Sequence, residues 1–97
     1  MKIKHKPLRR AVVRLLKEIK EKGDEPLTAN GIWNTLHQRK VLSQSYLQTP
    51  RVLGQLLPRT RGIGVNRKQG HYQSNGDSYV ADTYYLENEE AFLEWIG

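Results

Sequence analysis

Arginine and glutamine side chains recur on one side of a short stretch near the middle of the chain. Arg51, Gln55 and Arg59 are spaced four residues apart, so on a helix they share one face. Both residue types hydrogen-bond phosphate oxygens and base edges, and arginine can do so with two parallel bonds. The spacing therefore favours contact with phosphate groups and base edges.

The same stretch carries the signals of a helix over residues 49–58. Thr49 can accept a hydrogen bond from a free backbone N–H at a helix start, and Pro50 suits the first helical position. Gly54 falls on the polar side, where it either lets the helix approach a ligand closely or reflects close helix packing. Apolar residues form a stripe behind the polar face: Val52, Leu53, Leu56 and Leu57.

Other chemistry-bearing residues show no catalytic or metal-binding pattern. Gly62-x-Gly64 precedes a predicted strand, so it is not a dinucleotide loop, and no P-loop or nucleophile motif is present. Asp77 and Asp82 flank a predicted hairpin tip, where we expect no cavity. The histidines stand in separate segments without ligand spacing: His5, His37 and His71. We therefore expect no catalytic residue, no metal and no cofactor, in a protein that is not an enzyme.

Length and composition indicate one small domain. The chain has 97 residues, of which 37% are hydrophobic, and it has no cysteine. No apolar run approaches the roughly 18 residues of a membrane helix, and none resembles a signal peptide. We expect no membrane association and an intracellular protein, cytoplasmic or in the nucleoid or nucleus.

Positive charge is abundant and unevenly placed. The net charge is +6 and the isoelectric point about 9.8, which favours polyanionic partners. Residues 1–22 are strongly basic, residues 51–68 contain no acid, and residues 87–97 contain no base. The basic middle segment coincides with the predicted helix at 49–58 and the hairpin after it.

Two further helices precede that segment. Residues 1–6 form a basic arm, and the single domain spans residues 7–97. Helical periodicity predicts a helix over about 7–22, for which Gly23 is a suitable C-cap. A second helix is predicted over about 29–39, with Thr28 as its N-cap. Ser45 could begin a preliminary turn before Pro50.

Period-2 alternation predicts a β-hairpin over about 61–86. Asn75-Gly76 is the turn signal, and centring on it pairs Tyr72 with Tyr79, Arg67 with Tyr84 and Val65 with Leu86. Gly70 is a potential bulge that would shift this register. A short third strand at residues 25–27 could pair with the base of the hairpin.

A last helix is predicted over about 88–96, with Asn88 as its cap. Its apolar residues are too many for one narrow face. Some should pack on the first helix, and others, notably Phe92 and Trp95, could meet a second copy or another protein.

The order of three helices, a polar-tipped hairpin and a final helix resembles the winged helix-turn-helix family, an α+β fold. The likeness rests on Leu27-Thr28, Thr49-Pro50, the Leu53/Leu56/Leu57 packing and Tyr84-Tyr85-Leu86. It implies sequence-specific binding to double-stranded DNA, in the manner of a small transcriptional regulator, with helix 49–58 in the major groove. The hairpin would lie on the neighbouring backbone or minor groove. The implied DNA contacts are Thr49, Arg51, Gln55 and Arg59 on the helix, Arg61, Arg67, Lys68, His71 and Tyr72 on the wing, and Ser45 and Thr28 on phosphates.

Two other functions are compatible with the same sequence. The first is a protein-interaction adaptor within a larger nucleic-acid machine, acting through the C-terminal helix. The second is binding of structured RNA by the basic faces. Tyr79, Tyr84 and Tyr85 could stack on single-stranded bases, but half-buried sheet positions are the favoured reading.

Overall fold

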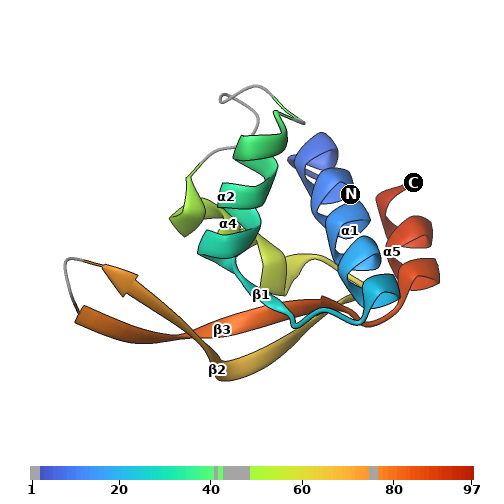
Figure 1. Ribbon diagram of the computed structural model, residues 1–97. Helices are drawn as coiled ribbons and strands as arrows, with labels where there is room; N and C mark the ends of the chain where they lie inside the picture. The colour runs from blue at the N-terminus through green and yellow to red at the C-terminus, as the bar shows by residue number, and fades with distance from the viewer. Residues whose placement is uncertain (1–2, 41, 43–48, 75–76) are drawn as a thin grey trace.

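The chain forms an α+β domain in which helices pack over one side of a small sheet (Figure 1). This computed structural model describes residues 3–40, 42, 49–74 and 77–97, and only the backbone of residues 68–74 and 77–79. Within those residues the chain makes four α-helices, one 3-10 turn and a three-stranded antiparallel sheet. In chain order they are α1 (Lys6–Lys22), β1 (Leu27–Thr28), α2 (Ala29–Arg39), α4 (Pro50–Leu56), η1 (Leu57–Arg59), β2 (Ile63–Ser74), β3 (Asp77–Leu86) and α5 (Glu89–Ile96).

Side-chain caps fix the starts of three helices. The hydroxyl of Thr28 accepts from the Gly31 N–H, that of Thr49 from the Val52 N–H, and the Asn88 side chain from the Ala91 N–H. Gly23 ends α1 in the left-handed conformation, with φ at 72°. These four predicted caps are confirmed, and the predicted helix at 49–58 is resolved into α4 and the 3-10 turn η1.

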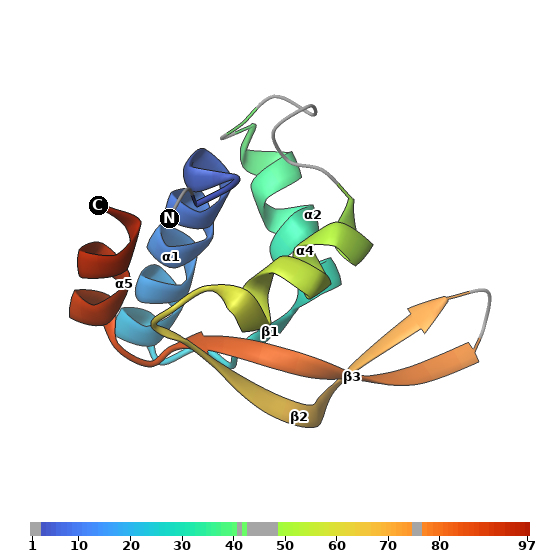
Figure 2. The ribbon, with the colours of Figure 1, turned by 180° about the vertical axis from the view of Figure 1, so that it is seen from behind.

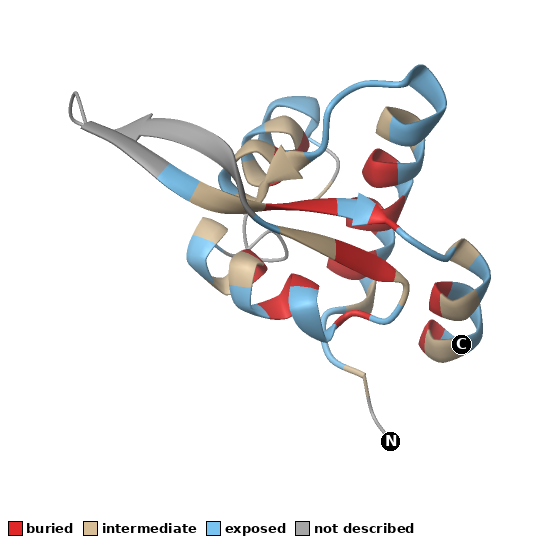
Figure 3. Cartoon of the chain, turned by 90° about the horizontal axis from the view of Figure 1, so that it is seen from below, coloured by how far each residue is buried: buried red, intermediate tan, exposed pale blue. Residues whose placement is uncertain are grey.

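The hydrophobic core lies between α1 and the other helices. Figures 2 and 3 show α5 beside α1, and buried residues on the inward sides of the helices and at the base of the hairpin. Ile3, which precedes α1, packs against this core, and so does Leu42, which follows α2. The fully buried side chains come from four helices and η1: Leu8, Val12, Leu16, Ile32, Leu36, Leu53, Leu57 and Phe92.

The sheet has the order β1-β3-β2, and its register changes along the hairpin. Near the tip Tyr72 pairs with Tyr79, as predicted. At the base Val65 pairs with Tyr84 and Ile63 with Leu86, so the predicted pairings of Val65 with Leu86 and Arg67 with Tyr84 are wrong. The shift falls between Asn66 and Gly70, where β2 carries more residues than β3. The Asn75-Gly76 turn lies outside the described residues.

β1 is the predicted third strand, displaced by one residue toward the C-terminus. Leu27 pairs with Tyr84 and Thr28 with Thr83. Because Thr28 also caps α2, this short strand joins the start of α2 to the base of the hairpin. The position of the hairpin relative to the helices is therefore set by direct backbone pairing.

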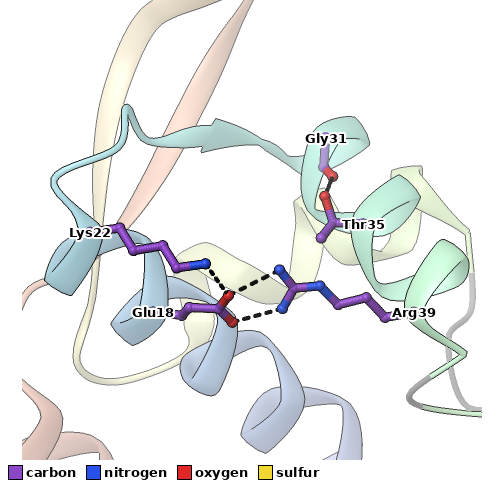
Figure 4. A network of polar contacts seen from close by, with 5 residues as sticks. All are labelled: Glu18, Lys22, Gly31, Thr35 and Arg39. Carbon is purple, nitrogen blue, oxygen red and sulfur yellow. Dashed lines mark hydrogen bonds and ion pairs between the residues drawn. The ribbon is translucent and has the colours of Figure 1, made fainter.

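An ion-pair network fixes α2 against α1 (Figure 4). The Arg39 guanidinium donates to both Glu18 carboxylate oxygens at 2.7 and 3.1 Å, and Lys22 Nζ donates to Oε1 at 2.8 Å. Those hydrogen bonds, Arg39 first and Lys22 second, lower the pKa of Glu18 from 4.5 to about 2.

Candidate nucleic-acid interface

The segment α4–η1 has one buried side and one polar, exposed side. Leu53 and Leu57 are fully buried and Leu56 nearly so, whereas Arg51, Gln55 and Arg59 are exposed. The buried leucines hold the helix against the core, so the polar face is presented on a rigid support. The structure thus brings together the three side chains that the sequence placed on one face.

The guanidinium groups on this face are not neutralised by acids. No ion pair joins Arg51, Arg59 or Arg61 to any carboxylate among the residues described, and all three are exposed. Thr49 is also exposed; its oxygen accepts from the Val52 N–H, which leaves the hydroxyl proton able to donate. This surface therefore offers donors to an acceptor-rich, negatively charged ligand.

Gly54 belongs to the contact between α4 and α2. A β-carbon built at Gly54 would lie 3.6 Å from the β-carbon of Ala29, an ordinary packing distance. Gly54 thus faces α2, at a distance that would also admit an alanine side chain. The polar face of α4 consequently consists of side chains.

The hairpin segment contributes two described cations, Arg61 and Arg67, of which Arg67 has an acidic partner. Arg67 is exposed, and its Nη1 lies 2.9 Å from Asp82 Oδ2 on the facing strand. The side chains of Lys68, His71 and Tyr72 lie outside the described residues, as does Ser45. Thr28, predicted to donate to phosphate, is half-buried and caps α2.

Asp82 lies in a cleft that the sequence analysis did not anticipate. The cleft, of about 280 Å³, separates the starts of α2 and α4 from β3. Arg51 lines the same cleft, so an acidic side chain borders the polar face of α4. The sequence predicted that Asp82 flanks the hairpin tip, where no cavity was expected. In the structure Asp82 pairs with Arg67, beside the register shift between Asn66 and Gly70.

The tyrosines of β3 are sheet residues. Tyr84 is 5% exposed, and burial, with a smaller contribution from Asp82, raises its pKa although Arg67 acts in the opposite direction. Tyr85 is more exposed, and its ring covers Gly64 on β2 so closely that a β-carbon there would collide with it. Tyr84 is therefore a sheet residue more deeply buried than the predicted half-buried position. The Tyr79 side chain lies outside the described residues.

The C-terminal helix exposes few apolar side chains to solvent. Phe92 is 1% exposed, so its predicted role in contacting a second protein is wrong: it fills the core. Trp95 is half-buried, with the Arg9 guanidinium carbon 5.0 Å from its ring centroid. Leu93 is the apolar residue of α5 that is well exposed, and single exposed apolar residues are ordinary on protein surfaces.

In the described part of the chain, no helix is long and apolar enough to cross a membrane. No three His, Asp or Glu side chains of the described residues gather as metal ligands would. Comparisons with protein-family models, with curated proteins and with solved structures found no match.

Proposed function

We propose that this protein is a winged helix-turn-helix domain that binds double-stranded DNA sequence-specifically, as a small transcriptional regulator. The observation that carries the proposal is the exposed row Arg51, Gln55 and Arg59 on a helix whose opposite side is anchored in the core. Such a row, free of paired acids among the described residues, suits a polyanion with readable base edges.

The dimensions of α4 suit the major groove. A helix with its side chains is about 10–12 Å in diameter, which a major groove about 12 Å wide admits. The seven residues of α4 extend about 10 Å along the helix axis. Arg51 and Gln55 are one turn apart, about 6 Å along the helix axis, which matches roughly two base-pair steps. Arg51 is assigned to guanine and Gln55 to adenine, while Thr49 and Arg59 contact the flanking phosphates.

The hairpin supports the proposal through its position. It begins directly after η1 and extends beyond the helices, as both ribbon views show (Figures 1 and 2). A duplex seated on α4 would then meet the hairpin on its neighbouring backbone or minor groove. Arg61 and Arg67 are the described cations in position to contact phosphate there.

Selection from a random pool of duplex DNA tests the proposal. We expect a short consensus, and Arg51→Ala should relax one position of it by about 1–3 kcal/mol, or roughly 5- to 150-fold. Lys17→Gln is the matched control, since Lys17 pairs with Glu89 on the α5 side of α1, away from α4. An unselected pool, or stronger binding to duplex RNA of the same sequence, would reject the proposal.

A further inference from the structure

A second cleft lies beside the polar face of α4, where the N-terminal segment meets the start of α1. It has a volume of about 220 Å³. Its polar lining comes from five residues of three segments, with no carboxylate among the lining residues: Lys4, His5, Arg9, Gln55 and Arg59, beside the apolar Val52 and Leu56. Lys4 and His5 are far from Gln55 and Arg59 in the sequence, and the fold places all four on one cleft.

Arg9 is the unusual member of this lining. It is only 6% exposed, and its Nε is buried without a hydrogen-bond partner. A buried charged group without an acceptor is costly, and that cost is relieved when an acceptor arrives. Stacking on Trp95 stabilises the cation but supplies no acceptor. Burial accordingly lowers the pKa of Arg9 from its ordinary value.

The N-terminal segment is held at this cleft by its own contacts. Ile3 packs against the core, and the His5 carbonyl accepts from the Arg9 N–H at 2.9 Å. His5 itself takes the left-handed conformation, with φ at 59°. That backbone turn at the start of α1 brings Lys4 and His5 to the side where Gln55 and Arg59 lie.

We propose that this cleft is a phosphate-binding site, centred on Arg9 and completed by Lys4, Gln55 and Arg59. A guanidinium, an ammonium and an amide are the donors that phosphate oxygens accept from, and the apolar wall of Val52 and Leu56 strengthens such bonds by excluding water. If the proposed function holds, a DNA backbone phosphate beside α4 is the natural occupant; a free phosphate anion has the same chemistry.

Trp95 and Trp33, the two tryptophans of the chain, make the site observable in the intact protein. Sodium phosphate is titrated at constant ionic strength against sodium chloride, following both indole N–H signals by NMR. We expect a saturable shift of the Trp95 signal with phosphate alone, while Trp33, stacked on His37 in α2, stays in place. Lys4→Gln should weaken the apparent affinity at least tenfold, and Lys17→Gln should not. Equal responses to phosphate and chloride would overturn the site.

Arg9→Met provides a second measurement that does not depend on the indole signal. Removing an unpaired buried charge should leave the fold intact and keep or raise Tm. Phosphate should raise Tm of the natural protein, by binding its folded state, and should fail to raise that of Arg9→Met. An equal rise in both proteins would contradict the site, because phosphate would then act without Arg9.

Duplex DNA separates the two sources of phosphate. If DNA shifts the Trp95 signal, and if inorganic phosphate competes with DNA in the natural protein but not in Lys4→Gln, the occupant is a backbone phosphate. If DNA does not bind while the phosphate response stands, the cleft serves a free anion and only the proposed function fails. If DNA binds with Trp95 unshifted and Lys4→Gln without effect, the site is overturned while the proposed function stands.

Discussion

Gly62 occupies a backbone position that other residue types adopt only with strain. Its φ is 95°, and its carbonyl accepts from the N–H groups of Glu87 and Asn88 at 2.8 and 3.0 Å. One residue therefore ties the turn before β2 to the start of α5. A β-carbon added there would lie 2.5 Å from the Asn88 carbonyl oxygen and 2.8 Å from the Phe92 β-carbon.

Gly62→Ala should lower the free energy of unfolding by about 3 kcal/mol, through backbone strain together with this collision. Gly23→Ala is the matched control: its φ of 72° is also positive, but nothing lies within 4 Å of an added β-carbon. That change should cost about 1 kcal/mol. Urea unfolding of both variants measures the difference, and equal losses would show that the contact with α5 adds nothing.

The burial of Arg9 could not be predicted from the sequence. In the sequence it is one of many cations before residue 23, next to the exposed Arg10. Its burial depends on Trp95, which is 86 positions away along the chain and packs beside it only once α5 docks on α1. Helical periodicity marks a core face but does not reveal which neighbouring residue a second helix will cover.

At the scale of elements, local signals predicted the helices better than the hairpin. The side chains of Thr28, Thr49 and Asn88 each accept a hydrogen bond from the backbone N–H three residues later. Such caps can therefore be predicted from the local sequence. The hairpin register depends also on β1, which pairs with the base of β3. Turn chemistry at Asn75-Gly76 correctly predicted the pairing near the tip, and Gly70, the potential bulge in the sequence, stands at the end of the register shift that begins at Asn66.

The Glu18 network predicts an acid-dependent loss of stability in the packing of α2 on α1. Because the pKa of Glu18 is about 2 in the folded protein and about 4.5 when unpaired, the unfolded chain takes up the proton first as pH falls. The stabilisation is thus complete above about pH 4.5 and is lost between pH 4.5 and 2. Glu18→Gln should lower Tm at pH 7, with the gap closing toward pH 2.

Thermal unfolding at several pH values measures that gap. Glu21→Gln is the control, since Glu21 is an exposed glutamate of α1 that makes no ion pair with a described residue. It should change Tm little at any of these pH values. A Glu18→Gln gap that stayed constant from pH 7 to 2 would mean that the ion pairs contribute nothing to stability.

The ion pair with Asp82 should weaken the binding of anions by Arg67 on the hairpin. Asp82→Asn removes a negative charge beside Arg51 and releases Arg67, so affinity for duplex DNA should rise by about two- to fivefold, the worth of an exposed pair. Glu89→Gln makes the same charge change at the Lys17 pair on the α5 side and should leave affinity unchanged. Fluorescence anisotropy on one labelled duplex compares them, and equal affinity of Asp82→Asn and the natural protein would place the wing away from DNA.

At the scale of the whole molecule, a net charge of +6 would attract any polyanion, so binding alone does not identify a specific face. The proposed interface has a sharper signature, because α4, η1 and the start of the hairpin carry four exposed arginines: Arg51, Arg59, Arg61 and Arg67. If the three arginines assigned to phosphates, Arg59, Arg61 and Arg67, each neutralise one, the slope of log affinity against log salt should be about −2.7, a roughly 40-fold loss between 50 and 200 mM salt.

Two double variants that have the same net charge distinguish binding by a localised face from general electrostatic attraction. Arg59→Gln with Arg61→Gln and Lys17→Gln with Lys22→Gln each lower the formal net charge from +6 by 2, to +4. The first pair lies on the proposed interface and should reduce the salt slope by about 2; the second lies on α1, in ion pairs with Glu89 and Glu18, and should leave the slope unchanged. Equal reductions in both would mean that DNA responds only to total charge, because then no particular surface of the domain is the one that meets the duplex.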